Sequence, residues 1–153
     1  MRNRQKGFSL IELLIVVAII LIIAAIAIPN LLRSRIAANE ASAVGSIRTI
    51  NTAEVTYAST YPDVGFAVLA SLGGAGGTSA NAGLLDSVLA SGTKSGYSFV
   101  VANLSSTVPV TTYTVNGDPL NSQTGQRHFF SDQSGVIRYN TSAAATGSDN
   151  PLQ

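Results

Sequence analysis

The segment from Lys6 to Asn30 reads KGFSLIELLIVVAIILIIAAIAIPN, and it decides how the rest of the chain is organised. Between Phe8 and Ile28 only Ser9 and Glu12 are polar. At roughly 1.5 Å per residue, a helix of this length crosses a hydrocarbon layer of about 30 Å. A carboxylate inside that layer costs on the order of 2.5 to 3.5 kcal/mol unless a partner or the membrane edge relieves it. A simple membrane anchor would be more stable in the membrane with leucine at this position. We therefore expect Glu12 to have a specific function.

Three residues at the start of this segment form a specific pattern. Gly7, Phe8 and Glu12, within GFSLIE and followed by a long apolar helix, resemble the prepilin signature of type IV pilins and of the pseudopilins of type II secretion. Pro29 matches a proline that pilins commonly carry at the end of the apolar run. The strong resemblance covers about residues 1 to 60, and the remainder is similar only in general character.

This resemblance implies a processing route. Residues 1–7 would be a prepilin leader peptide. The prepilin peptidase, a membrane aspartyl protease, would cut between Gly7 and Phe8 and methylate the new amine of Phe8. The mature chain would then be a single-pass inner-membrane protein with a cytoplasmic N-terminus.

The resemblance also implies a mode of assembly. Subunits would polymerise through the apolar helix into a helical homopolymer, with the help of the pilus or type II secretion assembly machinery. In such filaments an acid at the position of Glu12 attracts the amine of a neighbour's first residue, here Phe8, and sets the axial step. The filament would lie on the cell surface or span the periplasm.

Other interpretations of the segment are open at this point. A secretory signal peptide could be cleaved after the small-residue triplet Ala25–Ala27, and a simple signal anchor would also be apolar. The uninterrupted run Leu13–Ile28 is longer than a usual signal-peptide core, and neither interpretation explains Gly7, Phe8 and Glu12 together. For the acid itself, a position at the headgroup level, hydrogen-bonded to water, is the alternative to subunit pairing.

Composition limits the rest of the chain. A length of 153 residues bounds it to one globular domain besides the N-terminal helix. The net charge is +1, and about −2 once the basic leader residues Arg2, Arg4 and Lys6 are removed, which argues against a broad nucleic-acid surface. Cysteine is absent, which excludes a disulfide framework and a cysteine-ligated metal.

The helix is predicted to continue beyond Pro29. The next proline is Pro62, and apolar residues recur between the two at spacings of three, four or seven: Leu32, Ile36, Ala43, Ile47, Ile50, Tyr57 and Tyr61. This pattern predicts an amphipathic helix over residues 30–61, continuous with the apolar half over 8–29. Pro29 removes one backbone donor, so we expect it to kink the helix or loosen the turn before it.

Residues 62–153 are predicted to form a globular head, first with a helix-to-sheet connection. Two short helical stretches, 66–72 and 84–90, are separated by the glycine-rich sequence GGAGG, which is typical of a flexible loop.

A small antiparallel sheet should follow. Strands are expected at 96–102, 108–115, 127–130 and 136–140, with a turn at 132–135 joining the last two and residues 116–119 ending the second. The fold class is therefore α+β, with the sheet packed on the later half of the helix and the apolar half protruding. The tail after Tyr139 should be loose unless Leu152 docks on the sheet.

Little chemistry is expected in this head. His128 and Asp132 could belong to a Ser/His/Asp triad, but a single histidine at the start of an amphipathic strand is far more often a surface residue. We therefore expect no enzyme and no cofactor. Asp118 and Asp132 are weak calcium candidates, because the sequence DQSG lacks alternating oxygen ligands. Tyr57 and Tyr61 lie on one helical face and are expected in the core.

The main functional hypothesis is a pilin, the structural subunit of a type IV pilus-like filament. The lack of an evident calcium loop favours it over the first alternative, a pseudopilin of type II secretion. The second alternative is a membrane-anchored binding protein that never polymerises.

Overall fold

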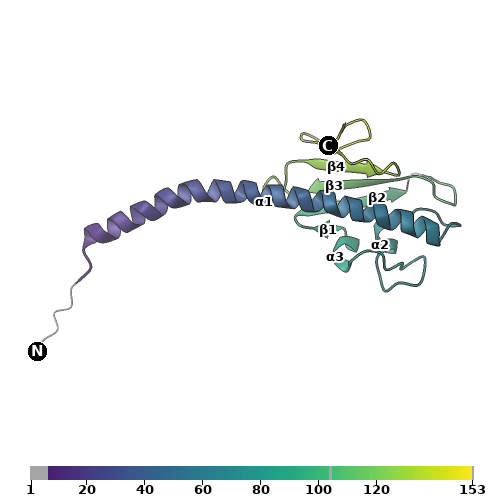
Figure 1. The fold of residues 1–153 in the computed structure, drawn as a ribbon, viewed down its shortest axis with the longest axis horizontal. Helices are drawn as coiled ribbons and strands as arrows, with labels where there is room; N and C mark the ends of the chain where they lie inside the picture. The colour runs from purple at the N-terminus through teal and green to yellow at the C-terminus, as the bar shows by residue number, and fades with distance from the viewer. Residues whose placement is uncertain (1–6, 104, 153) are drawn as a thin grey trace, which may run out of the picture. The chain divides into compact units, whose positions relative to one another are not determined.

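The computed structural model describes residues 7–103 and 105–152 and has the predicted α+β architecture. Of the expected leader peptide only Gly7 lies within the described residues. The long helix α1 spans Leu10–Thr60, within two residues of the predicted bounds, and contains Pro29 (Figure 1). The chain divides after Arg35 into two compact units, which are described separately.

The N-terminal unit consists of the start of the chain and the first part of α1. Every described residue from Gly7 to Arg35 is exposed apart from the half-exposed Ala24. An 18-residue window of α1 has a mean hydropathy of 3.3, and none of it is buried. By length and composition α1 can cross a membrane.

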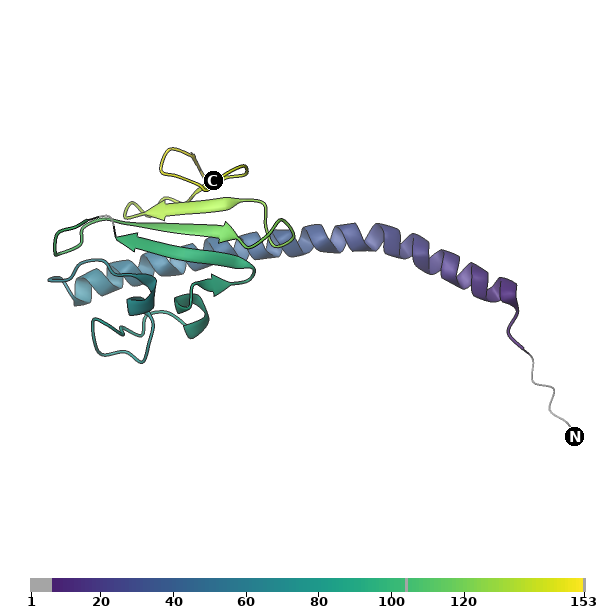
Figure 2. The same cartoon turned by 180° about the vertical axis from the view of Figure 1, so that it is seen from behind.

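The unit from Ile36 onward, the α+β unit, holds one six-stranded antiparallel sheet. Figure 2 shows the longer strands of this sheet beside the later part of α1. Neighbours in the sheet are also neighbours in the sequence, in the order β1 to β6. The strands are β1 Thr93–Lys94, β2 Tyr97–Asn103, β3 Tyr113–Pro119, β4 His128–Asp132, β5 Arg138–Asn140 and β6 Asn150–Pro151. Two short helices, α2 Leu69–Leu72 and α3 Ser87–Ala90, precede the sheet and contact each other.

The core lies between the later half of α1 and one face of the sheet. Ile47 and Ile50 of α1 are completely buried, as are Tyr97 and Phe129 of the sheet. Asn51 of α1 donates to the Ser131 hydroxyl at 2.9 Å and accepts from the Tyr113 hydroxyl at 3.1 Å. The predicted stripe therefore packs on the sheet from Ala43 to Tyr57, whereas Leu32 is exposed and Ile36 and Tyr61 are half-buried.

The predicted bounds of the strand at 108–115 were wrong, because the observed strand β3 spans Tyr113–Pro119. Residues 116–119, expected to end a strand at 108–115, lie inside β3, where Gly117 pairs with Phe99 and Phe129. A Cβ on Gly117 would stand 3.2 Å from both Ile47 Cδ1 and Phe99 Cε1, so glycine is there to let α1 approach the sheet, and not to form a turn. Val110 instead forms a parallel bridge with Gly65.

The short helices begin later than predicted because their first residues have other partners. The amides of Leu84 and Leu85 donate to the Leu72 carbonyl at 2.7 and 3.1 Å. The Asp86 carboxylate then accepts the Leu89 N–H at 3.0 Å, which caps α3 and starts it at Ser87.

The C-terminal tail is docked. Leu152 donates its N–H to the Ile137 carbonyl at 2.7 Å and packs against the core, while β6 pairs with β5. Ala145 is buried on the opposite face of the sheet from α1, where its carbonyl accepts from the Asn116 side chain at 3.2 Å. The predicted turn at 132–135 is confirmed, since Gly135 has φ of 74° and donates to the Asp132 carbonyl at 2.9 Å.

The close packing at Gly117 gives a first testable prediction. Gly117→Val should lower the free energy of unfolding by about 1 to 3 kcal/mol, because the added methyl groups overpack Ile47 and Phe99. Chemical denaturation of the full chain in detergent measures the effect. Gly45→Ala is the control, since an added Cβ meets nothing within 4 Å and should stabilise α1 by up to about 1 kcal/mol. A gain in stability from Gly117→Val, as expected for valine in an open strand, would contradict the packing.

Candidate functional site

The N-terminal turn of α1 brings Ser9 and Glu12 together. Ser9 directly precedes the helix, and Glu12 is the third helical residue. The Ser9 N–H donates to Glu12 Oε2 at 2.9 Å, and the Leu13 N–H donates to the Ser9 carbonyl at 3.2 Å. A glutamate that reaches back to the residue before the helix is half of a capping box. Glu12 therefore caps its own helix.

Sequence reasoning missed this contact, although the signal was present. Ser9 and Glu12 have the S-x-x-E spacing that marks a helix start before an apolar run. The position also suits a carboxylate because the first turn of a helix carries a partial positive charge. Of the two explanations for Glu12 taken from the sequence, neither included a bond within the chain.

The apolar side chains around this turn face outward on all sides. Phe8 is 74% exposed and Leu10 is 79% exposed. The exposed large apolar residues continue along the helix at Ile11, Leu13–Val17, Ile19–Ile23, Ile26, Ile28, Leu31 and Leu32. A contiguous apolar surface of this extent calls for lipid or other apolar helices around it.

Pro29 lies inside α1, and the helix continues on both sides of it. The Ser34 hydroxyl donates to the Asn30 carbonyl at 3.0 Å in the following turn. A kink at Pro29 stays a prediction.

Comparison with known proteins finds similarity at this end of the chain. Residues 2–28 match the model of the prokaryotic N-terminal methylation motif. The type IV wide pilus major component PilA4 of Thermus thermophilus is 68% identical over 40 residues, 26% of this chain and 30% of that protein. The type IV major pilin protein PilA of Myxococcus xanthus is 44% identical over 54 residues, 35% of this chain and 24% of that protein. No solved structure matches.

The chain is therefore similar to type IV pilins in its N-terminal segment. The matches cover less than a third of either relative's length. The match to the methylation motif, over residues 2–28, includes Gly7, Phe8 and Glu12. Pilin-family similarity points to a structural protein and not to an enzyme.

In the α+β unit, a second glutamate forms a clamp. Glu40 of α1 is 6% exposed and accepts the N–H groups of Gln126 and Arg127 at 2.9 and 3.2 Å. It also accepts from Arg127 Nε at 2.7 Å, and that guanidinium lies 5.6 Å from the Phe129 ring centre. Burial acts to raise the pKa of Glu40, but these hydrogen bonds and the Arg127 charge more than offset it and hold the pKa below its usual value of 4.5.

The structure separates the polar residues singled out from the sequence. His128 Nδ1 lies 2.6 Å from Asp118 Oδ1, on the neighbouring strand. Asp132 stands at the other end of β4, where its carboxylate accepts from the Ser134 N–H at 2.9 Å. His128 is therefore paired with Asp118 and not with Asp132, and the two weak calcium candidates do not meet. Over residues 7–103 and 105–152, no group of three or more histidine, aspartate or glutamate side chains could hold a metal ion.

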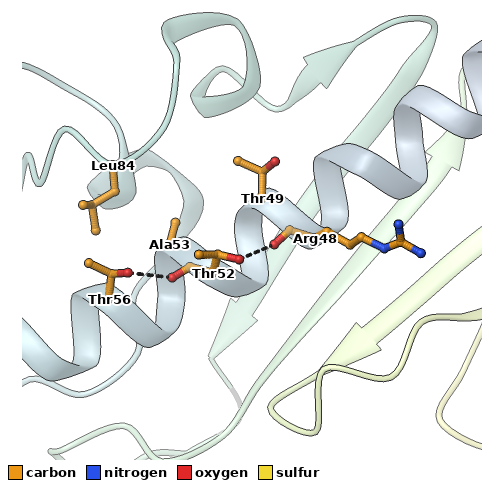
Figure 3. A pocket seen from close by; sticks show the side chains of 6 residues that line it. All are labelled: Arg48, Thr49, Thr52, Ala53, Thr56 and Leu84. Carbon is orange, nitrogen blue, oxygen red and sulfur yellow. Dashed lines mark hydrogen bonds between the residues drawn. The ribbon is translucent and has the colours of Figure 1, made fainter.

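A shallow hollow of about 310 Å³ lies along the exposed face of α1 in the same unit (Figure 3). Its lining residues are Arg48, Thr49, Thr52, Ala53, Thr56 and Leu84. The Thr52 and Thr56 hydroxyls each donate to a carbonyl of the preceding turn at 2.9 Å. This lining pairs no acid with a base, so it offers no evident chemistry.

The sequence-based predictions did not include two buried ionisable residues, and both are glutamates. The predicted stripe steps by seven from Ile36 to Ala43 and again from Ile50 to Tyr57. Glu40 and Glu54 fill these two gaps and are buried like Ala43, Ile47, Ile50 and Tyr57. The regular spacing was therefore the signal that could have found them.

The capping contact yields a prediction about Glu12. Glu12→Ala should weaken the first turn of α1 by about 0.5 to 1.5 kcal/mol, a two- to tenfold loss of amide protection, because the Ser9 N–H loses its acceptor. Amide hydrogen exchange of residues 9–13 in micelles measures this. Glu12→Gln keeps an acceptor and serves as the control. Unchanged protection in Glu12→Ala would contradict the cap.

Proposed function

We propose that this chain is the structural subunit of a type IV pilus-like filament. The helix half over residues 8–29 anchors it in the inner membrane after cleavage between Gly7 and Phe8. Subunits then polymerise through this apolar surface. The observation that carries the proposal is a carboxylate, Glu12, in a helix surface that is otherwise apolar and exposed.

Hydropathy alone does not support a filament over an anchor. A signal sequence near the N-terminus has the same length and composition, and so does a simple membrane anchor. For either of them the helix cap at Glu12, worth about 0.5 to 1.5 kcal/mol, does not offset a cost on the order of 2.5 to 3.5 kcal/mol for the acid in the membrane. A filament subunit does gain, because the acid can bind a charged group of another subunit.

The geometry at Glu12 leaves it able to bind such a group. An ionised carboxylate accepts up to about four hydrogen bonds, and Ser9 supplies one. The methylated amine of Phe8 on a neighbouring subunit would supply a cationic donor. Breaking a buried ion pair of this kind costs about 3 to 5 kcal/mol, so a wrong axial register would be penalised.

The partners follow from this function. They are identical subunits in a helical homopolymer, the prepilin peptidase, and the pilus assembly machinery. Before assembly the chain would lie in the inner membrane with a cytoplasmic N-terminus, and afterwards in a surface filament.

A pseudopilin of type II secretion would use the same N-terminal segment. Both relatives are named as major subunits of type IV pili, which supports the pilus for this chain. Filaments seen only on overexpression would favour the pseudopilin. A chain that stays monomeric in the membrane would favour a non-polymerising anchor.

Processing gives the next prediction. The mature chain should begin at Phe8 with a methylated amine, as measured by mass spectrometry of the N-terminal peptide from sheared filaments. Gly7→Leu should leave precursor in the membrane, because a side chain crowds the cleaved bond. A mature chain that retains Met1 or begins at Ile28 would refute the proposed processing.

Assembly gives the prediction that separates filament from anchor. Glu12→Leu should enter the membrane at least as well as the wild type, because the cost of the carboxylate disappears. Filament yield should nevertheless fall, because the neighbour's ammonium loses its partner. Glu12→Gln keeps hydrogen bonding without the charge and should give an intermediate defect. Membrane and sheared-filament fractions of each variant, expressed as the only copy, are compared.

Ser9→Leu is the matched control for this experiment. It also removes a polar side chain from the apolar segment but leaves the Ser9 backbone N–H and the carboxylate in place. Filament yield should stay near that of the wild type. Normal filaments from Glu12→Leu would return the acid to the headgroup-level interpretation.

A further inference from the structure

Glu54 is the most unusual ionisable group of the α+β unit. It lies in α1 with 0% exposure, next to the buried Tyr57. Its Oε2 accepts the N–H of Ala67 at 3.0 Å. Its Oε1 is buried and has no hydrogen-bond partner among the described residues. A buried carboxylate with an unsatisfied oxygen is costly, so this side chain calls for an explanation.

The Ala67 contact joins α1 to the chain segment that leaves it. We call residues 61–68 the return segment. It is held by the Phe66 N–H, which donates to the Val110 carbonyl at 3.0 Å, and by the Phe66 ring, 4.7 Å from the Tyr113 ring. Glu54 is the side chain of α1 that hydrogen-bonds to the backbone of this segment.

Comparison with Glu40 shows what Glu54 lacks. Both glutamates are buried on the same stripe of α1. Glu40 receives three hydrogen bonds, one of them from the Arg127 guanidinium. The ion pairs among the described residues involve Lys94, Arg127 and His128, and none of them includes Glu54.

The ionisable groups that face Glu54 do not compensate its charge. They are the phenols of Tyr57 on α1 and Tyr113 on β3. Burial, with a smaller contribution from the Glu54 charge, raises the pKa of Tyr57 and raises that of Tyr113 to about 12, so both phenols stay neutral at neutral pH. For Glu54 itself, burial raises the pKa to about 7, and the Ala67 hydrogen bond opposes this only in part.

We propose that Glu54 is a proton-controlled latch, which holds the return segment on α1 while its carboxyl is protonated and loosens it on ionisation. The neutral acid tolerates burial, whereas the carboxylate gains water when the segment opens. The latch does not require filament formation, because all the contacts of Glu54 and the return segment described above lie within one subunit.

The direction of the pH effect follows from linkage. The closed state binds its proton more tightly than the open state, in which the pKa is the ordinary value of 4.5. Opening therefore becomes easier as pH rises between about 4.5 and about 7, and it levels off above that range. The full change in the opening constant is on the order of a hundredfold.

Amide hydrogen exchange of the full, ¹⁵N-labelled chain in detergent micelles tests the latch. Protection of the Ala67 and Phe66 amides, corrected for intrinsic exchange, should fall at least about tenfold between roughly pH 5 and pH 8. Glu54→Gln should abolish this fall, because the side chain cannot ionise. Glu40→Gln is the matched control, a buried glutamate on the same stripe, and should retain it.

Two results would overturn the latch: protection that does not change with pH in the wild type, or the same fall in Glu54→Gln. If Glu54→Gln does not fold, the wild type alone decides. The Ala67 amide nitrogen shift should then titrate with a midpoint at about pH 6 or above. A lower midpoint, or no titration, rejects the proposal.

Discussion

The packing of Ile47 on α1 against Gly117 on β3 is the contact on which the α+β unit depends. A helix can lie this close to a sheet only where a strand residue lacks a side chain, and Gly117 provides that place. The approach fixes which residues of α1 face the sheet. Positions at the helical repeat before and after Ile47 are buried whatever their chemistry, and Glu40 and Glu54 are buried with them.

The three glutamates of the chain all lie on α1, and their surroundings give them three different properties. Glu12 is exposed and caps the helix through the Ser9 N–H. Glu40 is buried but fully paired, which keeps it charged. Glu54 is buried with one oxygen unpaired, which favours its neutral form. Three residues of the same type therefore have three roles: a helix cap, a structural clamp and, in our proposal, a proton-sensitive latch.

Local sequence signals predicted the α+β class, α1 to within two residues, and the turn between β4 and β5. They misplaced β3, because the dipeptide Asn116–Gly117 is typical of a turn when only neighbouring residues in the sequence are considered. They left the C-terminal tail loose unless Leu152 docks on the sheet, and Leu152 does hydrogen-bond to Ile137. In both places the outcome depends on partners that lie on another element.

The order of residues alone specifies the apolar helix, the GFSLIE motif with Gly7, Phe8 and Glu12, and the amphipathic repeat. Each is a property of consecutive residues, since helix formation depends on contacts within about one turn. Folding in three dimensions sets the strand register, the pairing of His128 with Asp118, and the burial of Glu40 and Glu54. These depend on contacts between residues far apart in the chain, where a single glycine sets how closely two elements approach and thereby which charges lose water.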